Sequence, residues 1–95
     1  MRLTNFEVES IRQTYYDVFK KGVIYLFGSR VDDSLKGGDI DLYIDSESGE
    51  NMLQKKLNFL VLLKEKIGDQ KIDVVISKDK TRVIEKEALK NGIRL

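Results

Sequence analysis

The stretch "LFGSRVDDSLKGGDIDLYID", residues 26–45, places acidic residues inside what otherwise resembles a buried strand. A glycine-serine pair, Gly28 and Ser29, ends one apolar run, and a second apolar run contains Asp39 and Asp41. Aspartate is depleted in strands, and burying an ionised carboxylate without a partner is costly. The carboxylates therefore need a partner, and the rest of the sequence indicates which kind.

The apolar runs on either side of the glycine-serine pair predict two strands. Residues 23–27, "VIYLF", are β-branched and aromatic, and residues 39–45 alternate strictly between apolar and polar side chains. This alternation predicts an apolar face made of Ile40, Leu42 and Ile44. The connection over 28–38 is rich in turn-forming residues, with room for one helical turn after Ser29, and Lys36 within it is expected to be a solvated loop cation.

An amphipathic pattern near the N-terminus predicts a first helix of about four turns. Thr4 and Glu7 have the spacing of a capping box, and Gly22 is suited to end the helix in a left-handed conformation. Apolar side chains recur at near-helical spacing between these ends: Phe6, Ile11, Tyr15, Val18 and Phe19.

The middle of the chain predicts a second helix and a third strand. The helix covers about 50–67 and ends at Gly68. Its stretch "FLVLL" at 59–63 is apolar on almost every side, so we expect it to need a second packing surface besides the sheet. The strand covers 71–77, "KIDVVIS".

The final segment predicts a third helix, with Asp79 or Thr81 as its cap and Asn91-Gly92 as its C-terminal signal. The order of elements is then α-β-turn-β-α-β-α. This order predicts an α/β fold with a small mixed β-sheet flanked by helices. At 95 residues, the chain is expected to form one domain over 1–95.

The predicted third strand supplies another acid, Asp73, in an apolar context. The period of two places Asp39 and Asp41 on one face, roughly 6–7 Å apart, and Asp73 reaches the same patch if its strand lies beside theirs. Three carboxylates this close would repel one another by several kcal/mol per pair, which a divalent cation would relieve. The alternative is that Asp39 caps a turn while the other two face solvent.

Composition limits which cation and which partners are possible. The chain has no cysteine and no histidine, which removes thiolate sites, typical zinc sites and histidine general bases. Oxygen ligands favour magnesium, manganese or calcium. A formal net charge of +1, without an apolar signal core or a membrane-length apolar run, predicts a cytoplasmic protein that binds neither nucleic acid nor membrane.

The glycine-serine pair predicts a phosphate-binding turn. Gly28 allows the backbone to turn sharply and approach a ligand, and Ser29 offers a hydroxyl and an N–H to phosphate oxygens. A glycine-serine pair by itself is usually a plain turn, so its position just before the acids carries the interpretation. The chain has no G-x-x-x-x-G-K-[ST] motif, which excludes a Walker-type loop.

Taken together, these motifs resemble the signature of the DNA polymerase β-like nucleotidyltransferase superfamily. The matching segments are "FGSR" at 27–30, "GDIDLYI" at 38–44 and "IDVVI" at 72–76. The tail over 83–95 resembles the C-terminal helix of the minimal nucleotidyltransferase (MNT) branch. The chain departs from many relatives in lacking a glycine a few residues after the serine and in having Gly38 before the D-x-D pair.

The resemblance implies a role for each motif in transferring a nucleoside monophosphate, with ATP as the expected donor of AMP. The catalytic acids would hold two Mg²⁺ ions, or Mn²⁺ in their place: Asp39, Asp41 and Asp73. Gly28 and Ser29 would bind the β- and γ-phosphates, and Arg30 would add positive charge there. The alternative for Arg30 is an exposed position on a helix surface.

The resemblance also implies a partner. MNT proteins resemble antitoxins paired with helical HEPN proteins, on which they transfer AMP to a tyrosine hydroxyl, so we expect a HEPN-type partner or a second copy of the chain to supply the acceptor. The other hypothesis is a binding module that neutralises such a partner by contact. Apolar side chains in residues 58–63, and Tyr15, Tyr16 and Phe19, would form its docking surface unless they simply cover the sheet.

Other classes of D-x-D protein fit less well. A haloacid-dehalogenase phosphatase would have threonine or valine where this chain has Leu42, and D-x-D glycosyltransferases need a much larger fold. A calcium loop starting at Asp39 would need glycine at its sixth position, where this chain has Ile44.

Overall fold

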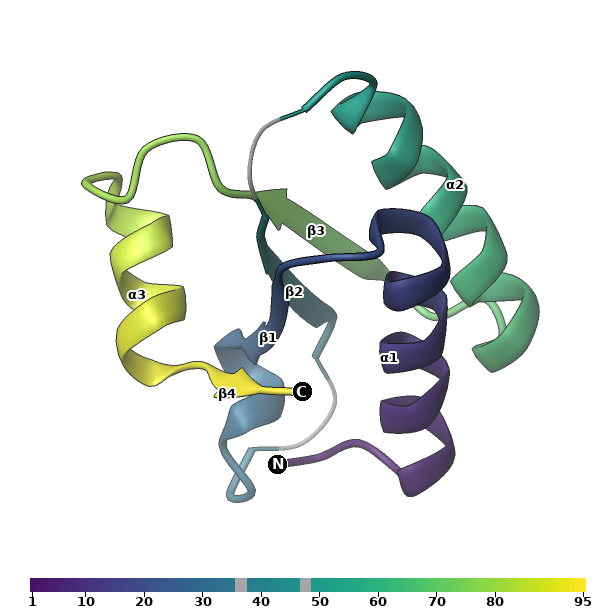
Figure 1. The fold of residues 1–95 in the computed structure, drawn as a ribbon. Coiled ribbons are helices and arrows are strands. Elements are labelled where there is room, and N and C mark those ends of the chain that lie inside the picture. Colours follow the sequence, from purple (N-terminus) through teal and green to yellow (C-terminus); the bar gives the residue numbers. More distant parts are fainter. Residues whose placement is uncertain (36–37, 47–48) are drawn as a thin grey trace.

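The computed structural model describes residues 1–35, 38–46 and 49–95, so Lys36 lies outside the described residues. Across these ranges the predicted α/β class is confirmed (Figure 1). The elements follow one another as α1 (Asn5–Phe19), β1 (Val23–Phe27), the 3₁₀ helix η1 (Gly28–Val31), β2 (Ile40–Asp45), α2 (Met52–Ile67), β3 (Ile72–Ile76), α3 (Val83–Asn91) and β4 (Ile93–Arg94).

Within the described part of the chain, four strands form one mixed sheet in the order β3-β2-β1-β4. β1 pairs antiparallel with both β2 and β4, whereas β2 and β3 are parallel because α2 carries the chain back between them. Figure 1 shows α1 and α2 on one side of the sheet and α3 on the other.

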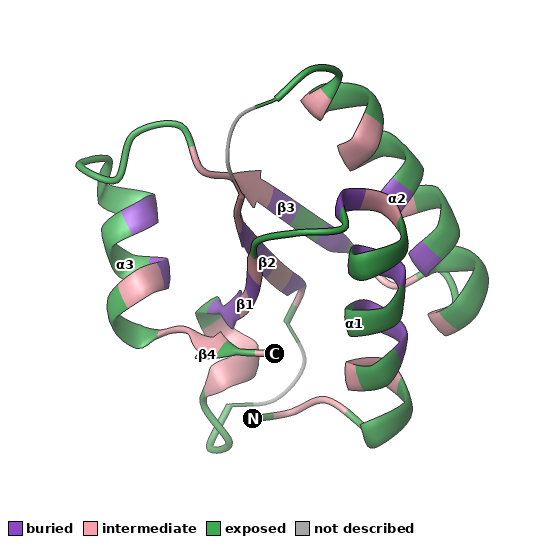
Figure 2. Ribbon diagram, viewed as in Figure 1, coloured by how far each residue is buried: buried purple, intermediate pink, exposed green. Residues whose placement is uncertain are grey.

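The face of the sheet toward α1 and α2 holds the main core. The predicted apolar face of β2 is confirmed, since Ile40, Leu42 and Ile44 are each 0 % exposed. Figure 2 shows the buried positions of the helices turned toward the strands. Fully burying an aliphatic side chain of this size contributes about 1.5–3 kcal/mol, so this face accounts for much of the stability.

An aromatic cluster joins α1 to α2. Tyr15 stacks on Phe19 with ring centroids 5.1 Å apart, and both meet the Phe59 ring edge-on at 6.4 and 6.2 Å. Tyr15 and Phe19 are therefore core residues, so the hypothesis that placed them on a docking surface is wrong for these two. Tyr16, the third residue of that hypothesis, is 65 % exposed.

The start of α1 matches the sequence, but its end does not. Thr4 and Glu7 form the predicted capping box. The helix ends at Phe19 with Lys20, whose φ is 68°, as its left-handed C-cap, and Gly22, with φ 92°, lies two residues beyond that cap. The side chain of Tyr15 accounts for this end. Its hydroxyl donates to the Lys21 carbonyl at 2.6 Å, and this bond stabilises a non-helical backbone at Lys21.

The predicted second helix and its stop are confirmed, with Gly68 as the C-cap of α2. Its apolar stretch is only half covered: Phe59 and Leu63 are fully buried, while Val61 is 59 % exposed. No helix within residues 1–35, 38–46 and 49–95 combines the length and apolar character needed to cross a membrane.

The predicted N-terminal cap of α3 is wrong, whereas its predicted C-terminal signal is confirmed, since the helix ends at Asn91 with Gly92 as its C-cap. Its N-cap is Arg82, and the Asp79 carboxylate instead accepts hydrogen bonds from the N–H and hydroxyl of Thr81, at 2.9 and 2.7 Å. The buried Glu85 joins the start of α3 to the sheet. Its carboxylate accepts hydrogen bonds from several donors: Tyr43 Oη, Ser77 Oγ, the N–H groups of Lys78 and Asp79, and Arg82 Nη1.

Strand β4 was not predicted from the sequence. Ile93 pairs with Leu26 and Arg94 with Tyr25, and the N–H of Leu95 donates to the Ile24 carbonyl at 2.9 Å. Two residues are too few to show an alternating pattern, so β4 depends on its partner strand and not on local sequence preference.

We expect Glu85→Gln to destabilise the fold by about 1–3 kcal/mol at pH 7, because the neutral amide has one acceptor oxygen instead of two and loses the charge-assisted hydrogen bonds that the carboxylate accepts. Burial raises the pKa of Glu85, but the N–H groups of Asp79 and Lys78 and the hydroxyls of Ser77 and Tyr43 outweigh it and lower the pKa to about 2. Urea unfolding across pH measures the effect.

Because the pKa of Glu85 is lowered on folding, its ionised carboxylate stabilises the folded state fully at pH values above 4.5, the usual pKa of glutamate. This contribution is lost as the pH falls from 4.5 toward about 2. The difference in unfolding free energy between wild type and Glu85→Gln should therefore decrease over this pH range. Glu87→Gln, at an exposed position of the same helix, is the matched control. Equal stability of the two variants at pH 7 would contradict this account.

Candidate active site

The candidate site lies on the face of the sheet that α3 only partly covers. Alternation along β2 places Asp41 and Tyr43 on this face, opposite the core residues. Asp41 pairs with Asp73 across the parallel strands, and neighbouring strands lie about 4.8 Å apart, so the two side chains leave the same side of the sheet. The structure thus brings Asp41 and Asp73 together as predicted.

The third predicted acid, Asp39, precedes β2 by one residue and shares the face of Asp41 by its spacing. Its Oδ2 lies 3.4 Å from the ammonium nitrogen of Lys71, a residue that the sequence analysis did not select. Lys71 stands two positions before Asp73, and this spacing was the signal that would have placed it on the same face.

Asp41 lies in an environment that disfavours its ionised form. Partial burial, followed by the charges of Asp73 and Asp39, raises the pKa of Asp41, and the charge of Lys71 opposes them. Among the residues that the structure describes, no three carboxylates converge closely enough to form a ready-made metal site. The donor set nevertheless fits a hard divalent cation, because all its atoms are oxygens and its charges repel one another.

Gly28 packs directly against this acidic pair. Its φ is 76°, a left-handed value that favours glycine, and a Cβ added there would collide with the Asp41 carboxylate oxygen and lie 3.2 Å from its Cγ. The register agrees, since the preceding Phe27 pairs with Asp41. The backbone at the glycine-serine turn and the D-x-D pair are therefore in contact, as the prediction of a joint site requires.

Ser29 closes the other side of the same turn. A Cβ on Gly38, which has φ 90°, would collide with the Ser29 hydroxyl and lie 3.3 Å from the Ser29 Cβ. Gly38 therefore lets the end of the loop approach its beginning one residue before Asp39. The predicted helical turn is confirmed as η1, which starts at Gly28 itself.

The environment of Arg30 excludes one of its two interpretations, and its role at the phosphates stays a prediction. It is half-buried, so it is not the exposed helix-surface arginine of the alternative interpretation. Its guanidinium donates to the Arg2 carbonyl at 2.9 Å and to the Gly38 carbonyl at 3.2 Å. These bonds engage it with the backbone of the chain, in a pattern that the sequence did not indicate.

A groove of about 550 Å³ lies elsewhere, beside the C-terminal half of β3. It is bordered by the start of α2 and by the segment leading to α3, through Met52, Leu53, Lys56, Val74, Val75, Ile76, Ser77, Lys78 and Arg82. None of the candidate acids is among these lining residues, so the groove and the acidic patch are separate features of the described structure.

Comparison with known proteins identifies the family. The model of the family described as "Polymerase beta, Nucleotidyltransferase" matches residues 9–95, which include the glycine-serine turn and all three acids. No curated protein matches the chain.

Gly28→Ala should destabilise the fold, because the φ of Gly28 is 76° and the added Cβ would meet the Asp41 carboxylate. Gly68→Ala is the control for backbone strain without a contact: Gly68 has φ 88° and ψ −176°, a conformation essentially limited to glycine, and its added Cβ would have no neighbour within 4 Å. Both variants should lose stability in urea unfolding, but only the loss at Gly28 should include a contribution from Asp41, of about 1 kcal/mol.

A double-mutant cycle with Asp41→Ala assigns this extra cost. Removing the Asp41 carboxylate should recover the cost specific to Gly28→Ala, but it should leave the cost of Gly68→Ala unchanged. Additive free energies for the Gly28→Ala and Asp41→Ala pair would show that the turn and the acid do not touch.

Asp41→Asn should stabilise the protein at neutral pH in the absence of divalent cations. The raised pKa of Asp41 means that folding disfavours its ionised form. The contribution of the protonated carboxyl to stability is therefore fully present at pH values below 3.8, the usual pKa, and it is lost as the pH rises through the pKa of the folded state. Solvent screening limits the gain to about 1 kcal/mol or less. The thermal midpoint in EDTA measures it, with exposed Asp69→Asn as the control; a lower midpoint for Asp41→Asn would refute the repulsion.

Proposed function

The chain belongs to the polymerase β nucleotidyltransferase family, and we propose that it transfers a nucleoside monophosphate, AMP from ATP, to a hydroxyl group on a partner protein. The observation that carries this proposal is the register of Asp41 with Asp73, directly beside the left-handed turn at Gly28. Two carboxylates directly opposite each other on neighbouring strands repel and destabilise the sheet, so a purely structural role does not explain the pairing.

The proposed cation site consists of Asp39, Asp41 and Asp73, which would hold two Mg²⁺ ions, or Mn²⁺ in their place. When bound, the ions would neutralise the triphosphate and lower the pKa of the attacking hydroxyl. Asp41 is half-buried and neighbours both other acids, Asp39 two residues earlier in the chain and Asp73 in register on β3. Asp73 is exposed and can face an incoming acceptor. Lys71 must then share Asp39 with the cation.

The proposed reaction is an in-line displacement at the α-phosphate. The acceptor oxygen forms a bond to the α-phosphorus as the bond to the bridging oxygen of the β-phosphate breaks, and pyrophosphate leaves with the electron pair. The hydroxyl proton passes to solvent at the exposed Asp73. Gly28 and Ser29 would hold the β- and γ-phosphates, so this chain contributes positioning and charge placement without a covalent intermediate.

We further propose that the acceptor is a tyrosine hydroxyl on a HEPN-type helical protein, with this chain as the antitoxin of the pair. The support is the resemblance of the motifs to the MNT branch, together with an exposed apolar surface. Leu53, Leu57 and Val61 follow one another at four-residue spacing on α2 and are 69, 48 and 59 % exposed. This α2 stripe is suited to a helical partner.

The second candidate function is neutralisation of the same partner by contact, without transfer. The α2 stripe favours it equally, because docking needs no catalytic acid. Asp39→Ala with Asp41→Ala distinguishes the two: a binding module keeps neutralising its partner, whereas a transferase loses the effect.

Transfer of label from α-³²P-ATP to the purified partner tests the proposal, with Mg²⁺ present. We expect labelling by the wild-type chain, its loss in EDTA, and a decrease of at least about 100-fold for Asp41→Asn combined with Asp73→Asn. Asp69→Asn, an exposed acid away from β2, is the matched control. Thermal midpoints of all variants separate lost chemistry from lost folding.

A partner that stays unlabelled with the folded wild-type chain, with every NTP and with Mg²⁺ or Mn²⁺, would refute the proposed transfer. If labelling were equal in the acid variant and the wild type, the acceptor would be modified but the assigned site would be wrong.

A further inference from the structure

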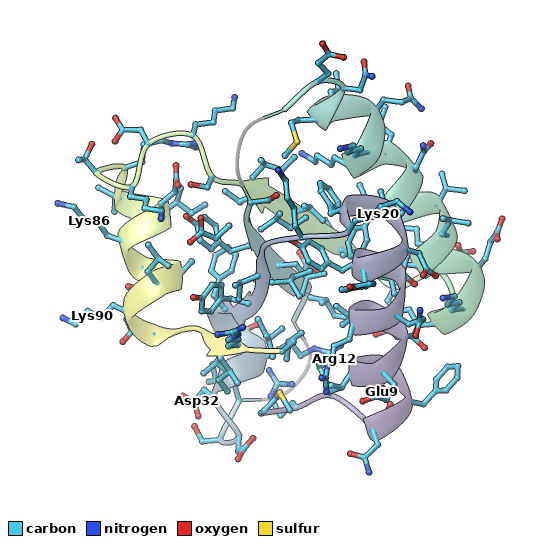
Figure 3. The ribbon with its side chains drawn as sticks, in the orientation of Figure 1. Glu9, Arg12, Lys20, Asp32, Lys86 and Lys90 are labelled. Atoms are coloured by element: carbon cyan, nitrogen blue, oxygen red, sulfur yellow. The ribbon has the colours of Figure 1, made fainter. Side chains whose placement is uncertain are left out.

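The N-terminal residues hold the glycine-serine turn through Arg2. The guanidinium of Arg2 donates from Nη2 to the Ser29 carbonyl and from Nε to the Asp32 carbonyl, both at 2.9 Å. The N–H of Arg2 donates to the Arg30 carbonyl at 2.8 Å. Figure 1 shows the N-terminus beside the segment that follows β1, and Figure 3 labels Asp32 there. One residue thus binds three carbonyls of the turn.

Arg30 returns these contacts from within the turn. It donates to the Arg2 carbonyl and, at the far end of the loop, to the Gly38 carbonyl. Its Nη2 also lies 3.5 Å from Oε1 of Gln70, whose amide donates to Glu7 at 2.6 Å. Arg2 and Arg30 therefore form a reciprocal brace that links the chain start, the turn and the residue before Asp39.

The brace determines more than the positions of the carbonyls. In a trans peptide the C=O and the following N–H point in opposite directions, so fixing the carbonyls of Ser29 and Arg30 also fixes the N–H groups of Arg30 and Val31. N–H groups of such a turn are the ones that bind phosphate oxygens. Holding its carbonyls from behind is a direct way to aim them.

We propose that Arg2 is a positioning residue for nucleotide binding, and that the guanidinium of Arg30 acts with it as a brace and not as a phosphate ligand. The inference rests on the proposed function. It concerns a residue outside the segment 9–95 that the family model matches, so family membership does not assign it. The chemical group that the braced turn would receive is the β,γ-diphosphate portion of an NTP.

A guanidinium suits this task better than an ammonium group. Arg2 uses two nitrogens of one planar fork on two carbonyls, whereas lysine offers a single nitrogen that cannot hold both in fixed geometry. Arg2→Lys therefore preserves the charge while it removes the brace. Preserving the charge matters because a positive charge at either arginine would attract phosphate even without contact. A loss of ATP binding in Arg2→Lys can then be assigned to the lost brace and not to a lost charge.

Steady-state kinetics of Arg2→Lys, with ATP as the varied substrate, tests the inference. We expect KM for ATP to rise about tenfold or more while kcat changes less, because the turn is displaced and the acids are not. A merely structural role would lower the thermal midpoint and the active fraction, leaving KM unchanged. Arg30→Lys should behave like Arg2→Lys.

Arg12→Lys is the matched control. Arg12 lies on α1 and is exposed, and its Nη1 lies 3.4 Å from Oε1 of the exposed Glu9. Figure 3 labels both residues. This substitution should leave KM, kcat and the midpoint unchanged. An unchanged KM for Arg2→Lys, in an enzyme whose wild type is active, would overturn the inference.

NMR of the ¹⁵N-labelled chain separates failure of this inference from failure of the proposed function. If the wild type transfers nothing, the proposed function fails, and the brace is judged by the amide signals of residues 28–33. Arg2→Lys should shift these signals and weaken their response to Mg-ATP, and Arg12→Lys should not. Signals and ATP response identical to wild type in Arg2→Lys would overturn the positioning role whatever the activity.

Discussion

The in-register pairing of Asp41 with Asp73 is the constraint to which the rest of the site responds. Parallel strands hold two carboxylates on one face, and partial burial together with the charge of Asp73 raises the pKa of Asp41. Gly28 then lies against the same carboxylate, in a conformation that excludes a side chain. The fold keeps this arrangement although it opposes stability, which is the behaviour expected of a site selected for binding and not for packing.

Stability comes from the two regions that flank this pair. The face toward α1 and α2 is dry and aliphatic, and it requires nothing from the acids. On the other face, α3 is fastened by Glu85, a fully buried carboxylate whose donors come from β2, from the end of β3 and from the start of α3. Glu85 and Asp41 are both acids on one side of the sheet, and their pKa values shift in opposite directions. Burial raises the pKa of both, but hydrogen-bond donors outweigh it at Glu85, whereas the charges of Asp73 and Asp39 add to it at Asp41.

Strict alternation over residues 39–45 was enough to predict β2, its apolar face and the common side of Asp39 and Asp41. Local sequence signals did not predict the features whose formation depends on partners distant in sequence. Glu85 resembles any helix-surface acid until Tyr43 and Ser77 surround it, and β4 forms because β1 offers a free edge. The hydrogen bonds of Arg30 depend on the position of Arg2, which is distant in sequence. Residue type and spacing predicted which acids share a face, but not which cations accompany them.

Lys71 shows how the acidic patch can persist without a bound cation. Its ammonium group lies 3.4 Å from Asp39, yet its side chain is 74 % exposed and that of Asp39 is 41 % exposed. An ion pair this accessible contributes about 1 kcal/mol or less, so it lowers the repulsion without holding Asp39 against a stronger ligand. A buried pair in the same place would have cost several kcal/mol to separate. The accessible pair therefore leaves the Asp39 carboxylate free to exchange Lys71 for a divalent ion.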